Sequence, residues 1–156
     1  MLNNRSAWPA RVRDQLSYRV YLDLTEVIDS GFGPEDVYVD SGFLDGGTLS
    51  DLQVANPTDN LYFFEVSYQG QAIGPGLGAA YRRESQIKFG LVPQAVGASW
   101  DISNDPSIAG LPIGQSSIVK SEMIAVYDAG ERVYGEEGTL DCNDNGIADS
   151  DEIADG

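Results

Sequence analysis

Short segments in which apolar and polar residues alternate are the feature that most restricts the fold of this chain. Residues 16–23, LSYRVYLD, place polar or half-polar side chains at every second position, with apolar ones between them. The apolar set is Leu16, Tyr18, Val20 and Leu22. Alternation with a period of two is typical of a β-strand with one buried face, because successive side chains point to opposite sides of a sheet.

The same alternation recurs along the chain between turn-rich connections. It predicts strands in residues 36–43, 60–69 and 82–92, and a hairpin in residues 121–135 that turns at Asp128-Ala129-Gly130. The 18 glycines and 7 prolines are scattered throughout and leave no window for a long amphipathic helix. One helical turn is predicted at residues 25–31, ended by Gly31 and Pro34. Many short strands separated by turns indicate an all-β sandwich.

The charge balance excludes several classes of function. The chain has 25 acidic and 9 basic residues, a net charge of −16, and no histidine. Such a chain repels phosphate backbones and anionic lipids, so we expect no nucleic-acid or membrane partner. Without histidine, Ser-His-Asp catalysis and His-ligated zinc are excluded. The N-terminus lacks the apolar stretch of a signal peptide, so an extracellular role implies an incomplete chain or export as part of a larger protein.

The composition changes near residue 138, where we place a domain boundary between residues 1–138 and 139–156. From Glu136 onward the chain is acidic and nearly free of large apolar residues. The single cysteine, Cys142, lies in this tail and has no partner for an internal disulfide.

The tail contains DCNDNGIADSDE, residues 141–152, which fits the EF-hand calcium-loop pattern at every specified position. The predicted calcium ligands are Asp141, Asn143, Asn145, the Ile147 carbonyl, Asp149 and Glu152. The loop resembles those of dockerins and thrombospondin type 3-like repeats. Too few residues follow for an exiting helix, so a disordered acidic tail is the alternative.

A second oxygen-rich set is divided between two parts of the predicted sandwich. Asp101, Asn104 and Asp105 lie within SWDISNDPS, and Asp23, Thr25 and Glu26 lie at the end of a predicted strand. Calcium takes six to eight oxygen ligands, often from flexible loops, so two loops that meet at one end of a sandwich would suit it. Asp and Asn clusters also form ordinary Asx turns, which is the alternative.

Candidate sugar contacts combine aromatic rings with planar polar groups, which pair with the apolar faces and the hydroxyls of a sugar. These residues are Arg19, Tyr81, Arg83, Glu84 and Tyr127. An ordinary ion pair between Arg83 and Glu84 is an alternative. We expect Trp8 to pack beneath a turn.

Four segments together resemble one known family. LNNRSAWPARVRDQLSYRVYLDLTEV, YRRESQIKF, WDISNDPS and VYDAGERVYGEE, in this order, are similar to the family 3 carbohydrate-binding modules. The likeness runs from about Leu2 to Glu137 and is nearest to subfamily c, which is fused behind family 9 catalytic domains in endoglucanases. It implies a jelly-roll β-sandwich of about eight to nine strands with a bound calcium.

The resemblance also implies particular site residues. The family's calcium site matches Asp23, Thr25, Asp101, Asn104 and Asp105, with Glu26 a weaker candidate, and its role is structural. Family members usually carry a leading strand before NNRSAWPAR, so we expect the first strand to be missing and one sheet edge to be exposed. No flat aromatic strip for crystalline cellulose can be assembled, and Trp100 falls in the calcium motif.

We therefore expect a secreted, non-catalytic module that binds cellulose or a soluble β-glucan chain and guides it to a glycoside hydrolase domain in the parent protein. Catalysis would need two carboxylates in a cleft, and the acidic residues fall in turns and calcium-type loops. The alternative is a calcium-stabilised structural or adhesive surface module. The two hypotheses differ in one feature, since only the sugar-binding module needs a groove lined by aromatic and arginine side chains.

Overall fold

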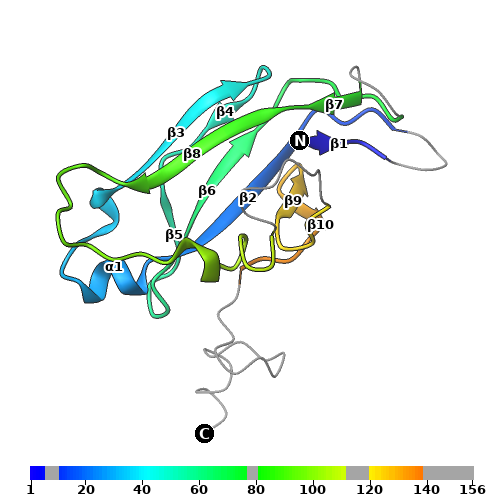
Figure 1. Ribbon diagram of the computed structural model, residues 1–156. Helices are drawn as coiled ribbons and strands as arrows, with labels where there is room; N and C mark the ends of the chain where they lie inside the picture. The colour runs from blue at the N-terminus through cyan, green and yellow to red at the C-terminus, as the bar shows by residue number, and fades with distance from the viewer. Residues whose placement is uncertain (6–10, 77–80, 112–119, 139–156) are drawn as a thin grey trace, which may run out of the picture.

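The larger layer of the structure is a six-stranded antiparallel sheet. The computed structural model describes residues 1–5, 11–76, 81–111 and 120–138. Within them the strand order is β10-β9-β2-β6-β4, and β5 also pairs with β6 (Figure 1). The strands are β2 (Leu16–Asp23), β4 (Thr48–Leu49), β5 (Gln53–Asn56), β6 (Leu61–Ser67), β9 (Ala125–Asp128) and β10 (Glu131–Tyr134).

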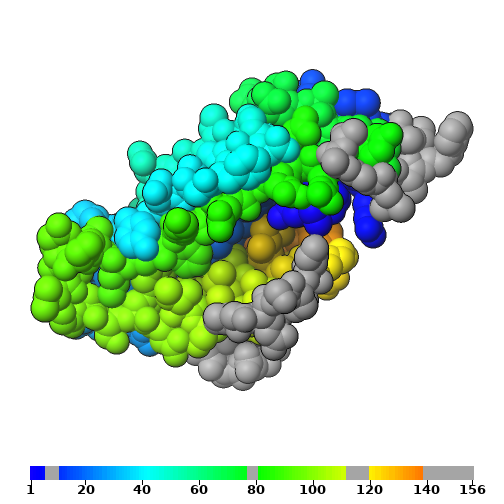
Figure 2. Space-filling model, turned by 45° about the horizontal axis from the view of Figure 1, so that its top comes forward, coloured from blue at the N-terminus to red at the C-terminus, as the bar shows by residue number. Residues whose placement is uncertain are grey.

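The second layer is an antiparallel pair of longer strands, β3 (Val37–Leu44) and β8 (Ser85–Leu91). Figure 2 shows this layer as a ridge across the molecule, with the yellow-green segment that follows β8 beneath it. A short pair, β1 (Leu2–Asn3) and β7 (Arg82–Arg83), lies beside the start of β8. The all-β sandwich predicted from the alternation is confirmed.

The main core lies between the two layers. Its buried members on β2 and β6 include Val20, Leu22 and Phe64, and β8 contributes half-buried Ile87 and Phe89. These are the residues that the alternation placed on the inward faces. Burial of such side chains contributes roughly 25 cal/mol per Å² of apolar area, so this cluster is the main source of the sandwich's stability.

Several boundaries differ from the sequence prediction. The described residues form ten strands, whereas the family resemblance implies about eight to nine. The alternation does not predict the short strands β4 and β5, and residues 82–92 form two strands broken at Glu84. The helical turn is confirmed as α1 (Thr25–Asp29), and the remaining elements are the 3₁₀ turns η1 (Pro34–Asp36) and η3 (Ile102–Asn104). The predicted hairpin turns at Ala129 and Gly130, both with positive φ, as a tight two-residue turn requires.

The outer face of the large sheet has its own apolar cluster, which the alternation did not predict. Its buried members are Tyr21, Leu61, Phe63, Ala125 and Tyr127. The outward face of β2 had been interpreted as polar, yet Tyr21 is only 4% exposed there. Some side chains on this face are therefore covered by their neighbours, and they lie beneath a polar groove on the outer surface of the sheet. No helix among the described residues is long and apolar enough to cross a membrane.

Candidate functional site

A shallow polar groove lies on the outer face of the large sheet, over β2, β6 and the β9–β10 turn. Its lining residues are Gln15, Ser17, Arg19, Glu65, Ser67, Gln69, Tyr127, Ala129 and Gly130. The antiparallel register of β2 and β6 explains the set, because it places Ser17 opposite Ser67 and Arg19 opposite Glu65 on the same face.

Among the described residues, Arg19 is the only cationic one that lines this groove, and it is held on three sides. Its Nε donates a hydrogen bond to Glu65 Oε2 at 2.8 Å. Its guanidinium carbon lies 4.5 Å from the ring centre of Phe63 and 4.4 Å from that of Tyr127. Burial lowers the pKa of Arg19, but the hydrogen bond to Glu65 raises it and the net direction is upward. The guanidinium is therefore a fixed, charged plane between two rings.

A chain of hydroxyl groups continues the polar row toward the end of the sandwich. Tyr127 Oη donates to Glu137 Oε1 at 2.7 Å and lies 3.1 Å from Tyr21 Oη. Burial is the largest cause of a raised pKa at Tyr127, reinforced by its bonds to Tyr21 and Glu137. Because the phenol stays protonated, it remains a hydrogen-bond donor.

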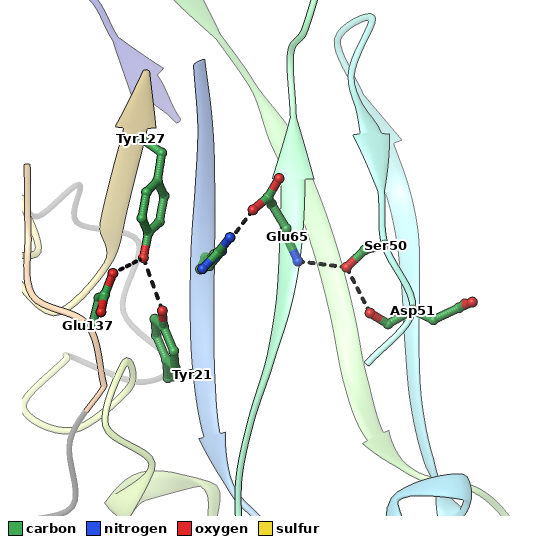
Figure 3. A network of polar contacts seen from close by, with 7 residues as sticks. Tyr21, Ser50, Asp51, Glu65, Tyr127 and Glu137 are labelled. Carbon is green, nitrogen blue, oxygen red and sulfur yellow. Dashed lines mark hydrogen bonds and ion pairs between the residues drawn. The ribbon is translucent and has the colours of Figure 1, made fainter. Parts of the chain in front are cut away.

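Figure 3 shows this row crossing the sheet, with Tyr127, Tyr21 and Glu137 on one side of β2 and Glu65 on the other. Beyond Glu65, the Ser50 hydroxyl accepts from the Glu65 backbone N–H at 2.9 Å and donates to the Asp51 carbonyl at 2.7 Å. Planar guanidinium and carboxylate groups beside aromatic rings are the chemistry that sugar recognition requires.

The segment Asp105-Pro106-Ser107 hydrogen-bonds to the C-terminal end of β2. Strand β9 pairs with β2 only as far as Arg19, opposite Ala125. Beyond that point, Ser107 Oγ accepts from the Tyr21 N–H at 2.8 Å, and Asp105 Oδ1 accepts from the Asp23 N–H at 2.7 Å. Two side-chain oxygens thus take the place of strand carbonyls, which explains why Asp105 and Ser107 are fully buried.

The carboxylate of Asp105 has one oxygen in use and one without a partner. Oδ1 also accepts from Trp100 Nε1 at 3.3 Å, whereas Oδ2 is buried and makes no hydrogen bond in the described part of the chain. Burial raises the pKa of Asp105 to about 7; bonds from Asp23 N–H and Trp100 oppose this rise, and the Asp23 and Glu26 carboxylates add to it. An unpaired buried carboxylate oxygen facing other carboxylates is the environment that a cation relieves.

The surrounding oxygens are present but do not form a cage. Asp23 Oδ1 accepts from the Thr25 N–H at 2.8 Å, and Glu26 accepts from the Asp101 N–H. Asp101 Oδ1 accepts from Ser103, as in an Asx turn, and Asn104 is exposed in η3. No three acidic side chains of the described chain converge on one point. Since calcium also takes hydroxyl, carbonyl and water oxygens, the donor set fits calcium.

Without a bound cation, Asp105 gives the chain a defined pH dependence. Its folded pKa of about 7 is above the unfolded value of roughly 3.9, so the folded state binds the proton more tightly. The contribution of this proton to the free energy of unfolding is fully present below the unfolded pKa and is lost as pH rises through about 7. Urea unfolding in chelator is therefore expected to give a free energy that falls from about pH 5 to about pH 8. The Asp105→Asn variant should lack this part of the slope, and an equal slope in both proteins would contradict the assignment.

Comparison with known families identifies the chain. The family CBM_3, described as "Cellulose binding domain", matches residues 1–135 of the 156. The chain belongs to this cellulose-binding domain family. A domain of this kind is a non-catalytic part of endoglucanases.

The relatives of this cellulose-binding domain are much longer endoglucanases. It is 37% identical over 135 residues to Endoglucanase 4 of Bacillus sp. (strain KSM-522), covering 86% of this chain and 20% of that protein. It is 36% identical over 135 residues to Endoglucanase A of Bacillus pumilus, again covering 86% of this chain and 20% of the relative. The chain thus spans about a fifth of the length of these relatives.

Solved structures give the same fold. Endoglucanase CelQ from Clostridium thermocellum, complexed with cellotetraose, aligns with a TM-score of 0.75 and 34% identity, covering 87% of this chain and 22% of that one. A family 3b module from the cellulosome of Bacteroides cellulosolvens aligns at 0.57 with 18% identity, covering 86% of this chain and 79% of that one, and shows the fold alone.

The structure separates the residues predicted for sugar contact in this cellulose-binding domain. Arg19 and Tyr127 meet in the groove, but Tyr81, Arg83 and Glu84 lie in or beside β7 and do not line it. The alternative ion pair between Arg83 and Glu84 is wrong, because Glu84 pairs with Arg82 and Arg83 lies 4.0 Å from Asp45. Trp8 and the tail loop, Asp141 to Glu152, lie outside the described residues.

Sequence reasoning missed the groove residues that only the register could reveal. Those that line the groove are Glu65 and Ser67 on β6 and the glutamines Gln15 and Gln69. Those that contact its side chains without lining it are the buried Phe63 and Tyr21, and Glu137 after β10. The alternation in residues 60–69 did place Glu65 outward. It carried no sign of which strand lies beside β6.

Proposed function

We propose that this cellulose-binding domain holds a β-glucan chain along the outer-face groove and acts as a non-catalytic accessory module of a secreted modular cellulase. In this role it guides a single chain toward a glycoside hydrolase domain of the parent protein. The observation that carries the proposal is the Arg19 guanidinium, fixed between Phe63 and Tyr127 and bonded to Glu65. The two rings are buried and hold the arginine, so that Arg19 and Glu65 present planar polar groups that can bond sugar hydroxyls.

The groove favours sugar binding over the alternative of a structural or adhesive surface module. A spacer has no need of a preformed arginine between two rings, because holding a charged side chain in one conformation costs entropy. The endoglucanase CelQ, 34% identical to this chain, has been solved with cellotriose and with cellotetraose. This relationship supports a cello-oligosaccharide as the ligand class.

The outer face of the second layer supports weak binding to crystalline cellulose. The β3–β8 register brings Tyr38, Asp40 and Lys88 together, and Phe43 lies farther along β3. Tyr38 is 42% exposed and Phe43 is 53% exposed. This row holds two exposed aromatic side chains, which favours weak over strong binding to a crystal surface. We propose subfamily c from the sequence resemblance, and the similarity to endoglucanase CelQ supports only an origin in an endoglucanase.

We also propose that a structural calcium ion lies at the end of β2. The residues that would hold it are Asp23, Thr25, Glu26, Asp101, Asn104 and Asp105, and the unpartnered Oδ2 of buried Asp105 supports this assignment. A bound cation would neutralise carboxylates that otherwise repel one another and would fix α1 and the η3 loop to the strand. The tail loop of residues 141–152 is proposed as a second calcium site on its sequence pattern alone.

Titration of the whole chain with cellotetraose in a calorimeter tests the proposed function. We expect saturable binding of cellotetraose, weak co-sedimentation with crystalline cellulose and no release of reducing sugar from soluble cellulose. Saturable binding would support the sugar-binding role, and its absence at millimolar cellotetraose would favour the structural module. Measurable turnover of soluble cellulose by the pure chain would overturn the non-catalytic assignment.

A further inference from the structure

We propose that Glu137 is a positioning residue of the groove, which fixes the Tyr127 ring against the Arg19 guanidinium. Glu137 lies on the segment Gly135–Gly138, called the strap here, which follows β10 and ends the described chain. The effect on sugar affinity rests on the proposed function, but the arrangement of the rings does not.

The strap is held closely on the outer face of the sheet. Gly135 has φ +72°, and a Cβ there would overlap the Ile124 carbonyl. The Glu136 N–H donates to the Glu122 carbonyl at 2.7 Å. A Cβ on buried Gly138 would overlap Tyr21 and would lie 3.2 Å from Pro106. Only glycine fits at both ends of the strap, so the backbone that carries Glu137 is fixed beside the groove.

Glu137 sets the direction of the hydroxyl chain. A tyrosine hydroxyl has one proton to donate. Because Tyr127 gives its proton to the Glu137 carboxylate, it must accept from Tyr21 in the 3.1 Å contact between the two hydroxyls. The order Tyr21 to Tyr127 to Glu137 follows. A charged acceptor makes the last bond the strongest of the chain.

The Tyr127 ring is the part of the groove that this bond controls. Its centre lies 4.4 Å from the Arg19 guanidinium carbon. Glu65 bonds the Nε of Arg19 and the Tyr21 side chain also hydrogen-bonds to the guanidinium, while the Phe63 and Tyr127 rings flank it. A ring fixed at its hydroxyl end preorganises the arginine for a ligand, which lowers the entropy lost on binding.

The neighbouring strap carboxylate provides a matched comparison. Glu136 forms an exposed ion pair with Arg132 at 3.1 Å, an interaction that contributes little. Glu137 is also exposed but bonds to a phenol that is 4% exposed. Two adjacent glutamates of equal charge thus have different partners: Glu136 pairs with an exposed arginine and Glu137 contacts a ring of the groove.

The experiment compares Glu137→Ala, Glu137→Gln and Glu136→Ala in the whole chain by NMR, calorimetry and thermal melting. In the wild-type chain, the Arg19 side-chain protons should show strong upfield ring-current shifts. We expect Glu137→Ala to lose at least half of this shift and Glu137→Gln, which keeps an acceptor oxygen, to retain most of it. Glu136→Ala should retain it fully. Cellotetraose affinity should fall about fivefold to tenfold in Glu137→Ala alone.

The outcomes separate this inference from the proposed function. Unchanged Arg19 shifts in Glu137→Ala would overturn the positioning role, and so would an equal loss in Glu136→Ala. If Glu137→Ala loses the Arg19 shift but the wild-type chain does not bind cellotetraose, the result would support the positioning role and overturn the sugar site. A lower melting temperature with intact shifts would show that Glu137 only stabilises the fold, which also overturns the inference.

Discussion

Millimolar calcium is expected to raise the melting temperature of this domain by roughly 10 °C over the same protein in chelator. A ligand that binds only the folded state, at a free concentration 1,000 times its Kd, stabilises it by about 4 kcal/mol, and each kcal/mol shifts the melting temperature by about 2–4 °C for a chain of this size. Differential scanning calorimetry measures the shift. Its physical source is the buried Asp105 carboxylate, whose Oδ2 has no partner among the described residues.

Asp105→Asn is expected to change the melting temperature in opposite directions in chelator and in calcium. The amide oxygen keeps the acceptor for the Asp23 and Trp100 N–H groups, while the buried charge is removed. In chelator at pH 8 the variant should therefore melt at or above the wild-type temperature, and in calcium it should melt well below it. Asp141→Asn, in the tail loop, should leave the calcium shift unchanged. A calcium shift that survives Asp105→Asn but not Asp141→Asn would assign the effect to the tail.

Replacing Arg19 is expected to remove most of the affinity for cello-oligosaccharides. Arg19→Ala loses the charged plane between Phe63 and Tyr127 and leaves Glu65 without its partner. A loss of about 3 kcal/mol, roughly a hundredfold in Kd, lies in the range found when an arginine that dominates a binding site is truncated. Calorimetric titration with cellotetraose measures it, with the melting temperature recorded to confirm the fold.

Two further variants make this test specific. Arg19→Lys keeps the positive charge but not the planar guanidinium. Relative to Arg19→Ala, it should therefore restore more of the melting temperature than of the cellotetraose affinity. Lys88→Ala removes an exposed cation from the outer face of the β3–β8 layer and should leave cellotetraose affinity unchanged. Equal losses in Lys88→Ala and Arg19→Ala would place the sugar on the opposite layer or show a general effect of charge.

Strand β2 joins the groove to the proposed cation site. The Tyr21 hydroxyl contacts that of Tyr127, which lines the groove, and the Tyr21 backbone N–H donates to Ser107 Oγ. Two residues farther along, the Asp23 N–H donates to Asp105 Oδ1. The Asp105-Pro106-Ser107 segment therefore supports the outer edge of the strand that carries Arg19. A cation bound at Asp105 would stabilise the groove through this edge, without touching a sugar.

Local sequence patterns determined the layers and faces of this protein. The alternation in residues 16–23 and 60–69 placed Val20, Leu22 and Phe64 in the core, because the period of two is set by the backbone itself. The turn at Ala129-Gly130 and the helical turn after Asp23 were also predicted, because positive φ and helix termination are local properties. Asp105 was selected from its motif, although its burial was not predicted.

Only the tertiary structure decided which of the outward residues act together. Arg19 meets Glu65 across 46 positions, Tyr21 meets Tyr127 across 106, and Glu137 reaches Tyr127 from the strap. Tyr81, Arg83 and Glu84 have equally suitable chemistry, but they lie in or beside β7, which pairs with β1 instead of joining the large sheet. Strand partners and register follow from long-range pairing and core packing, which a local pattern does not encode.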